Sequence, residues 1–208
     1  RSTLLEAGVR IISGHGRLES GTAVVVSTGP GGTDFDRIEA DTLVISVGAS
    51  PREIASAPPD GERILTWTQL YNMKAMPEHL IVVGSGVTGA EFASAYMNLG
   101  SKVTLVSSRD QVLPGEDAGA AQVLERVFKR GGMTLLSKAR ADKVERVGDG
   151  VRVTLGDGRT IEGSHCLMAV GSIPNTENLG LETAGIVANR GYITVDKVSR
   201  TSARGVYA

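Results

Sequence analysis

One short segment constrains the fold of this chain more than any other: a glycine-rich turn between an apolar strand and a helix. Leu80-Ile81-Val82-Val83 is uniformly apolar, as expected of a strand that is covered on both faces. Gly84 to Gly89 follow with the pattern G-x-G-x-x-G, and a helical stretch then runs from Ala90 to Leu99 and stops at Gly100. This order predicts the start of a β-α-β unit.

The following residues extend the unit through a second helix and two more strands. Lys102–Val106 is the second predicted strand and Met133–Leu136 the third. Between them Asp117 is placed to cap a helix that ends at Gly131-Gly132. Its predicted buried stripe is Ala120, Val123, Leu124, Val127 and Phe128. The β-α-β-α-β order predicts parallel strands with right-handed crossovers.

The chain also carries an internal repeat. Residues 38–51 align with residues 161–174 at a constant offset, with five of 14 positions identical. In the later copy, a predicted hairpin around Gly156-Asp157-Gly158 leads to a buried strand that ends at Gly171. We infer that residues 1–51 correspond to the second half of a domain that residues 80–174 contain whole.

A short segment before the central unit carries its own signals. Thr66-Trp67-Thr68-Gln69 is a capping box and predicts a short helix that reaches about Met76. The stretch 55–61, rich in Pro, Asp and Gly, is typical of a domain boundary.

Composition narrows the possible classes of function. With 22 Lys+Arg against 23 Asp+Glu, the formal net charge is −1, which argues against electrostatic binding to nucleic acid or membrane surfaces. No apolar run approaches 18 residues, so we expect no transmembrane span. The single cysteine, Cys166, excludes an internal disulfide framework. Glycine is abundant, at 27 of 208 residues, and indicates many tight turns.

The glycine-rich turn points to a dinucleotide. Gly84 would permit the tight turn, Gly86 would let backbone N–H groups approach a pyrophosphate, and Gly89 would allow close packing of helix against strand. The positive end of the helix would face the phosphates. A plain strand-turn-helix is the structural alternative.

The end of the second strand bears on which coenzyme binds. A carboxylate there would hold both ribose hydroxyls and repel a 2′-phosphate, but this chain has Ser107-Ser108-Arg109 instead. Arg109, together with Lys102, would attract the phosphate of NADPH. We therefore favour NADPH, with NADH also accepted. In the alternative interpretation Arg109 is a solvated loop charge.

Few other residues point to catalysis. Glu91 either stabilises the start of its helix or orients a nicotinamide amide and pairs with a cation beside it. The histidines, His15, His79 and His165, lack the spacing of metal ligands, so we expect structural roles and no metal site. Cys166 lies in an apolar strand and reads as a core residue.

Several motifs together resemble one family. They occur in the order Val47–Pro51, Gly84–Glu91, Ala169–Asn175, Gly191–Asp196 and Gly205–Ala208. The set resembles the FAD-dependent pyridine nucleotide–disulfide oxidoreductases over nearly the whole chain. Asp60–Trp67 is most similar to the actinobacterial NAD(P)H quinone dehydrogenase branch, which itself resembles dihydrolipoamide dehydrogenase.

The resemblance implies an α/β fold with two nested domains. A Rossmann-like NAD(P)-binding domain, built of a parallel sheet plus a β-meander, would span residues 58–173. It would be nested within parts of a second, FAD-binding Rossmann-like domain at residues 1–57 and 174–208. The family's cysteine pair would lie before Arg1, and its His–Glu pair and dimerisation domain after Ala208. We therefore expect a fragment that is inactive by itself, from an intact protein that is a homodimer.

The resemblance also assigns site residues. Glu91 matches the carboxylate that pairs with a lysine beside the flavin and positions the nicotinamide, and Val87 falls where some members carry a tyrosine over the flavin. Ser172 stands where many members have an arginine. The positions that match NAD(P) contacts are Gly84, Ser85, Gly86, Val87, Thr88, Gly89, Glu91, Ser107, Ser108, Arg109, Val144 and Gly171, and those that match FAD contacts are Val47, Gly48 and Ala49.

The implied function is the passage of a hydride from NAD(P)H to FAD and of electrons to a small-molecule, quinone-like acceptor. Dihydrolipoamide dehydrogenase and soluble pyridine nucleotide transhydrogenase are alternatives within the family, separated by whether the cysteine pair exists. A non-catalytic nucleotide-binding module is the alternative of another class. We expect a cytoplasmic protein without a nucleic-acid partner.

Overall fold

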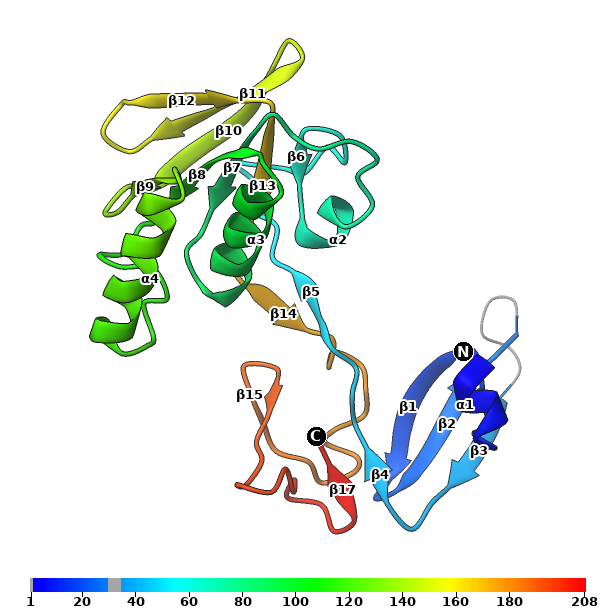
Figure 1. Cartoon of the computed structure of the whole chain (residues 1–208). Coiled ribbons are helices and arrows are strands. Elements are labelled where there is room, and N and C mark those ends of the chain that lie inside the picture. The colour runs from blue at the N-terminus through cyan, green and yellow to red at the C-terminus, as the bar shows by residue number, and fades with distance from the viewer. Residues whose placement is uncertain (1, 30–34) are drawn as a thin grey trace. The chain divides into compact units, whose positions relative to one another are not determined.

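The computed structural model describes residues 2–29 and 35–208 (Figure 1). The chain divides into two compact units, one made of Arg1–Ser50 with Ile173–Ala208 and the other of Pro51–Ser172. The chain enters the second unit after residue 50 and leaves it after residue 172, whereas the sequence analysis expected these changes after 57 and 173. The cofactors assigned to the parts remain predictions.

The second unit is built on a five-stranded, all-parallel sheet. Its strands in spatial order are β6 (Ile64–Leu65), β13 (His165–Met168), β7 (His79–Val83), β8 (Lys102–Val106) and β9 (Thr134–Leu136). Helix α3 (Val87–Asn98) joins β7 to β8, and α4 (Ala118–Arg130) joins β8 to β9. The predicted β-α-β-α-β unit is confirmed.

Alternating side chains of the parallel strands enter two different cores. Leu80 and Val82 of β7 pack in the cluster that contains Ala93 of α3 and Phe128 of α4. Ile81 and Val83 pack instead with residues of an antiparallel sheet. That sheet is formed by β10 (Ala141–Val147), β11 (Gly150–Leu155) and β12 (Thr160–Gly163). A strand covered on both faces explains the uniform apolar run in the sequence.

The predicted buried face of α4 was partly wrong. Asp117 caps the helix by accepting a hydrogen bond from the N–H of Ala120 at 2.9 Å, as predicted. The buried residues are Ala121 and Phe128, whereas Val123 and Val127 are 53% and 49% exposed. The apolar residues of α4 extend over a wider part of the helix surface than the part that is buried. The apolar pattern alone therefore did not define which of these residues are buried.

The one-turn helix α2 (Trp67–Leu70) is shorter than predicted. Its capping box is present, with the N–H of Thr66 donating to Oε1 of Gln69 at 2.8 Å. The prediction extended this helix to about Met76, but helical structure ends at Leu70.

The first unit contains smaller sheets. After α1 (Ser2–Glu6) come the antiparallel strands β1 (His15–Ser20), β2 (Ala23–Ser27) and β3 (Phe35–Glu39). Two further strand pairs in this unit are β4 (Leu43–Val44) with β17 (Val206–Tyr207) and β15 (Ala188–Asn189) with β16 (Tyr192–Ile193). A third pair, β5 (Ala49–Pro51) with β14 (Ser172–Pro174), includes the residues at which the chain passes from one unit to the other. Among the described residues, no helix is long and apolar enough to cross a membrane.

The internal repeat has a structural counterpart. In each copy a three-stranded antiparallel sheet is followed by a parallel-paired strand, β4 in one and β13 in the other. The glycines that close these copies, Gly48 and Gly171, both have positive φ, at +67° and +113°. The same backbone demand at equivalent positions explains why glycine is repeated there.

Candidate functional site

Two glycines of the turn after β7 are required by the packing of the chain itself. Gly84 has φ +110°, and a Cβ atom there would overlap the carbonyl oxygen of Ala169, directly after β13. A Cβ atom on Gly89 would overlap the carbonyl oxygen of Gly84. The turn therefore lies between β7 and β13, where the strand order reverses and where α/β sheets bind their ligands.

Gly86 has no such internal reason to be glycine. Its φ is −68°, a value open to any residue, and a Cβ atom there would meet no atom within 4 Å. It is the N-cap of α3, whose first backbone bond runs from Ala90 N–H to Gly86 O at 2.9 Å. The N–H groups of residues 87–89 consequently have no acceptor within the helix and are available to an anion.

Ser85 and Ser107 are buried and bonded to each other. They are 5% and 2% exposed, and their Oγ atoms lie 2.7 Å apart. The carbonyl oxygen of Ser85 also accepts a hydrogen bond from Leu113 N–H at 2.8 Å. These contacts fix the glycine-rich turn to the loop that follows β8.

The loop after β8 presents Arg109 to solvent on a fixed backbone. The N–H of Arg109 donates to Oγ of Ser107 at 3.1 Å, and its carbonyl oxygen accepts from Lys138 N–H at 2.9 Å. Lys102 is not near this loop, because it opens β8 and therefore lies at the opposite edge of the sheet. The expectation that Lys102 helps to bind a phosphate beside Arg109 was wrong.

A cavity of about 290 Å³ lies at the carboxyl ends of the central strands. Gly84, Ser108 and Arg140 all line it. Arg140 was missed by the sequence analysis, although it follows the third predicted strand in the run Lys138-Ala139-Arg140. Its Nε lies 3.6 Å from a carboxylate oxygen of Asp142, and both side chains are largely exposed.

Val87 and Glu91 lie one turn apart on α3. Both side chains are exposed, Val87 by 57%, and both line a second cavity of about 680 Å³ beside Ala90 and Leu113. Thr88 is half-buried. In the part of the chain that the structure describes, Glu91 forms no ion pair.

The other predicted contacts differ in accessibility. Val144 is 3% exposed in the core, and its N–H donates to Ser56 O at 3.0 Å. Gly171 is exposed. In the other unit Val47 and Gly48 are exposed and Ala49 is half-buried. The side chain of Asn175 donates to Val47 O at 3.1 Å and so fixes this segment.

Cys166 and the histidines of the sheet occupy structural positions. Cys166 is fully buried, and burial raises the pKa of its thiol well above the ordinary value. His79 bonds to Oγ1 of Thr104 at 2.9 Å. Burial lowers the pKa of His79 and of His165, with Lys102 and Arg63 as the neighbouring charges that lower them further. Within residues 2–29 and 35–208, no three His, Cys, Asp or Glu side chains are grouped as a metal site.

The sheet order and the glycine-rich turn at its reversal define a Rossmann-like α/β protein. The model of the pyridine nucleotide-disulphide oxidoreductase family matches residues 2–208. The chain belongs to this family.

Relatives of known name agree with that membership. A protein named NAD(P)H dehydrogenase (quinone) from Mycobacterium tuberculosis is 56% identical over 99% of this chain and 43% of its own length. A dihydrolipoyl dehydrogenase from Zymomonas mobilis is 34% identical over 100% of this chain and 45% of its own length. The chain thus spans less than half of these relatives.

Solved structures show the same fold. The crystal structure of LpdA from Mycobacterium tuberculosis matches with a TM-score of 0.83 and 53% identity, over 99% of this chain and 46% of that one. The flavoprotein disulfide reductase RclA from Escherichia coli matches with a TM-score of 0.77 and 27% identity, over 96% of this chain and 45% of that one.

Proposed function

We propose that this chain is the nucleotide-binding part of a flavin-dependent oxidoreductase that uses NAD(P)H to reduce a quinone-like acceptor. The observation that carries the proposal is Gly86. Gly84 and Gly89 are glycine for internal packing, but the space beside Gly86 is open. Gly86 is the N-cap of α3, and the first N–H groups of a helix have no acceptor within it. A pyrophosphate is the group that this arrangement suits.

Residues of both units would hold the cofactors. We assign the NAD(P)-binding domain to residues 58–173 and parts of the FAD-binding domain to residues 1–57 and 174–208. When bound, NAD(P)H supplies a hydride and FAD accepts it. Gly86 and the start of α3 would bind the pyrophosphate, and Val87 with Glu91 would face the nicotinamide. Val47, Gly48 and Ala49 are assigned to FAD.

Two arginines support a preference for NADPH. Arg109 and Arg140 stand on the loops after β8 and β9, and Arg140 lines the cavity that Gly84 and Ser108 also line. No carboxylate ends β8, where one would repel a 2′-phosphate. Two guanidinium groups are well suited to a phosphate dianion.

The test uses the full-length protein with its flavin bound. Anaerobic stopped-flow mixing with NADPH should bleach the flavin absorbance, and a water-soluble quinone should then restore it. Failure of NADPH and NADH to reduce the flavin would contradict the proposal.

Dihydrolipoamide dehydrogenase activity is the second candidate, because a relative at 34% identity carries that name. Reduction of NAD⁺ by dihydrolipoamide, without turnover of the quinone, would favour this candidate.

A further inference from the structure

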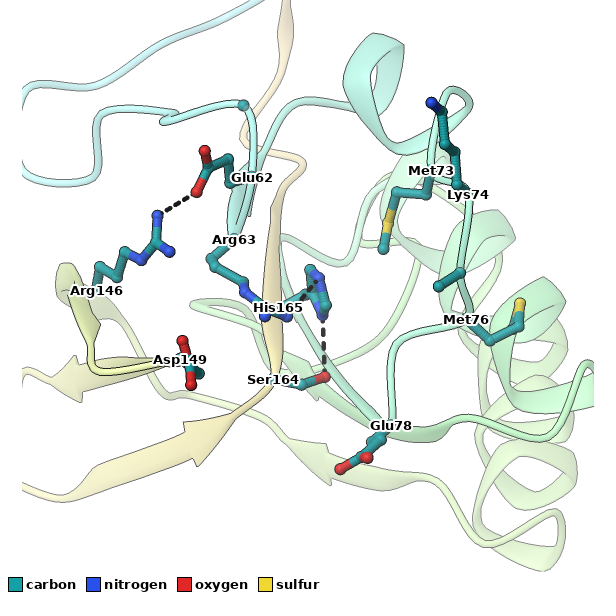
Figure 2. Close-up of a pocket in the computed structure, with 12 residues that line it drawn as sticks. Glu62, Arg63, Met73, Lys74, Met76, Glu78, Arg146, Asp149, Ser164 and His165 are labelled. Atoms are coloured by element: carbon teal, nitrogen blue, oxygen red, sulfur yellow. Dashed lines mark hydrogen bonds and ion pairs between the residues drawn. The ribbon is translucent and has the colours of Figure 1, made fainter.

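A separate cavity opens at the amino ends of β6, β7 and β13, the opposite end of the parallel strands from the glycine-rich turn. Its volume is about 640 Å³, within the range of small-molecule sites. Figure 2 shows that its walls come from the segments before these strands, from the residues after α2 and from the β10–β11 hairpin. We call it the Arg63 cavity. It shares no lining residue with the cavity beside Gly84.

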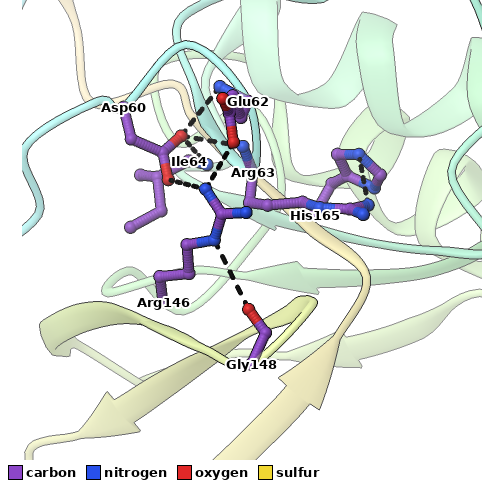
Figure 3. Close-up of polar contacts among 7 residues, drawn as sticks. All are labelled: Asp60, Glu62, Arg63, Ile64, Arg146, Gly148 and His165. Atoms are coloured by element: carbon purple, nitrogen blue, oxygen red, sulfur yellow. Dashed lines mark hydrogen bonds and ion pairs between the residues drawn. The ribbon is translucent and has the colours of Figure 1, made fainter.

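The backbone that carries Arg63 is held rigidly. Oδ1 of Asp60 accepts hydrogen bonds from the N–H groups of Glu62, Arg63 and Ile64 at 2.7–2.9 Å (Figure 3). The carbonyl oxygen of Arg63 accepts from Cys166 N–H at 2.8 Å. The guanidinium therefore projects from a fixed point, which lowers the entropy cost of binding a ligand.

The polar partner of Arg63 is a neutral imidazole. Nη1 of Arg63 lies 3.1 Å from Nε2 of His165, and a guanidinium can only donate, so Nε2 must be the acceptor. Nδ1 then carries the proton and donates to Oγ of Ser164 at 3.0 Å, which in turn donates to His79 O at 3.0 Å. The direction of the whole chain of hydrogen bonds requires an uncharged His165.

Three of the four carboxylates around the cavity interact with a different cation, and the fourth, that of Glu78, forms no ion pair among the described residues. Arg146 bonds to the carboxylate of Glu62 and lies 3.9 Å from that of Asp60 (Figure 3). Asp149 acts electrostatically on the same guanidinium. Arg63, by contrast, forms no ion pair among the described residues. The half-buried guanidinium of Arg63 thus has no carboxylate partner within the fold.

Two methionines of the segment after α2 contribute apolar surface to the same cavity. Met73 is half-buried and Met76 is 48% exposed, and both line the cavity. Figure 2 shows the side chain of Lys74 extending away from the Arg63–His165 pair. Thioether side chains adapt to carbon skeletons of varied shape.

We propose that the Arg63 cavity binds a carboxylate-bearing organic molecule, with the carboxylate on the Arg63 guanidinium and the carbon skeleton against Met73 and Met76. A carboxylate accepts two parallel N–H bonds from one guanidinium, a geometry that a neutral amide cannot match. The ligand would leave the bond from Arg63 to His165 in place and supply the missing negative charge. This inference goes beyond the proposed function and does not depend on it.

Benzoate and benzamide, which share a ring and differ in charge, are the probes. Calorimetric titration of the full-length protein should give a benzoate affinity at least about tenfold higher than that of benzamide. Arg63→Gln should weaken benzoate binding by at least about tenfold. The matched control Arg159→Gln removes an exposed arginine of the β11–β12 hairpin and should leave it unchanged.

Nitrogen NMR of His165 provides a second readout that needs no variant. A bound carboxylate beside Arg63 should raise the pKa of His165, whose surroundings include Arg63 and Asp60 from the turn before β6, Glu78 before β7, and Arg146 and Asp149 of the hairpin. Benzamide should leave the pKa of His165 unchanged.

Equal affinities for both probes, absence of benzoate binding, or an unaltered benzoate affinity in Arg63→Gln would each overturn the inference. NADPH binding should be the same in Arg63→Gln and Arg159→Gln. Failure of the carboxylate proposal can therefore be distinguished from failure of the proposed NAD(P)H function.

Discussion

The carbonyl oxygen of Gly84 occupies the space that a Cβ atom of residue 89 would need. These two residues are the ends of one turn, and their contact brings the start of α3 directly against the end of β7. The same compact turn leaves the space beside Gly86 open. Within this turn, Gly84 and Gly89 are therefore required by the packing of the fold, whereas Gly86 would be required only by a ligand.

Replacing Gly89 by alanine should destabilise the protein strongly. The added methyl group meets backbone rather than a flexible side chain, so the turn must move, at a cost of about 2 kcal/mol or more. Urea unfolding of Gly89→Ala against the parent protein measures this cost. Gly115→Ala is the matched control, because a Cβ atom there meets nothing within 4 Å. Equal stability of both variants would contradict the packing argument.

The buried Ser85–Ser107 bond should couple the glycine-rich turn to the loop after β8. Removing one hydroxyl leaves the other without its 2.7 Å partner and should cost about 1–3 kcal/mol. The double variant Ser85→Ala/Ser107→Ala should lose less than the sum of the two single variants. Denaturant unfolding of all four proteins gives the coupling energy. Strict additivity would mean that the two hydroxyls act independently.

Arg109 and Arg140 should set the preference for NADPH over NADH. Replacing both by glutamine removes the two charges proposed to meet the 2′-phosphate, and should lower the NADPH/NADH ratio of flavin reduction rates at low coenzyme concentration by about tenfold. Arg159→Gln again serves as the control. A ratio that stays constant in the double variant would assign both arginines to the solvated surface.

Two histidines should make the fold sensitive to mild acid. The pKa of His79 and of His165 is lowered mainly by burial, so the folded chain binds fewer protons than the unfolded chain below about pH 6.5. Their contribution to stability is complete above that pH and is lost as the pH falls through the folded pKa. The thermal midpoint should therefore drop between pH 7 and pH 5.

Variants separate this effect from general acid denaturation. His165→Gln and His79→Gln should each flatten the dependence of the midpoint on pH. The exposed His15→Gln is the control. An equal slope in all variants would show that the sheet histidines do not carry the effect.

The central unit was predictable because its strands are buried on both faces. Leu80–Val83 is a continuous apolar run, and Lys102–Val106 is apolar at three of its five positions. The helix between them is followed by Gly100, and the helix after the second strand is capped by Asp117. These are local signals that tertiary contacts reinforce. The face of α4 was less predictable, since Val123 and Val127 are as apolar as the buried Ala121 and Phe128.

The site was predictable as a motif, and its details depend on contacts distant in sequence. Ser85 and Ser107 are predicted to contact a nucleotide, and that prediction stays open; the sequence did not indicate that their side chains bond to each other in the core, 22 residues apart. Arg140 could not be placed beside Gly84 from the sequence, because only the parallel pairing of β8 with β9 brings its loop to the same end of the sheet. Lys102 begins β8 and Arg109 follows the end of that strand, so the length of β8 separates the two side chains.

Gly86→Ala tests the central claim most directly. The backbone at Gly86 accepts alanine, and the poorer N-cap and the stiffer unfolded chain offset each other to within about 1 kcal/mol. The decisive measurement is the dissociation constant of NADPH for the full-length Gly86→Ala protein, with Gly115→Ala as control. We predict binding at least about tenfold weaker, or about 1.4 kcal/mol, at nearly unchanged unfolding stability. An NADPH affinity equal to that of the control would contradict the assignment of this turn to the coenzyme.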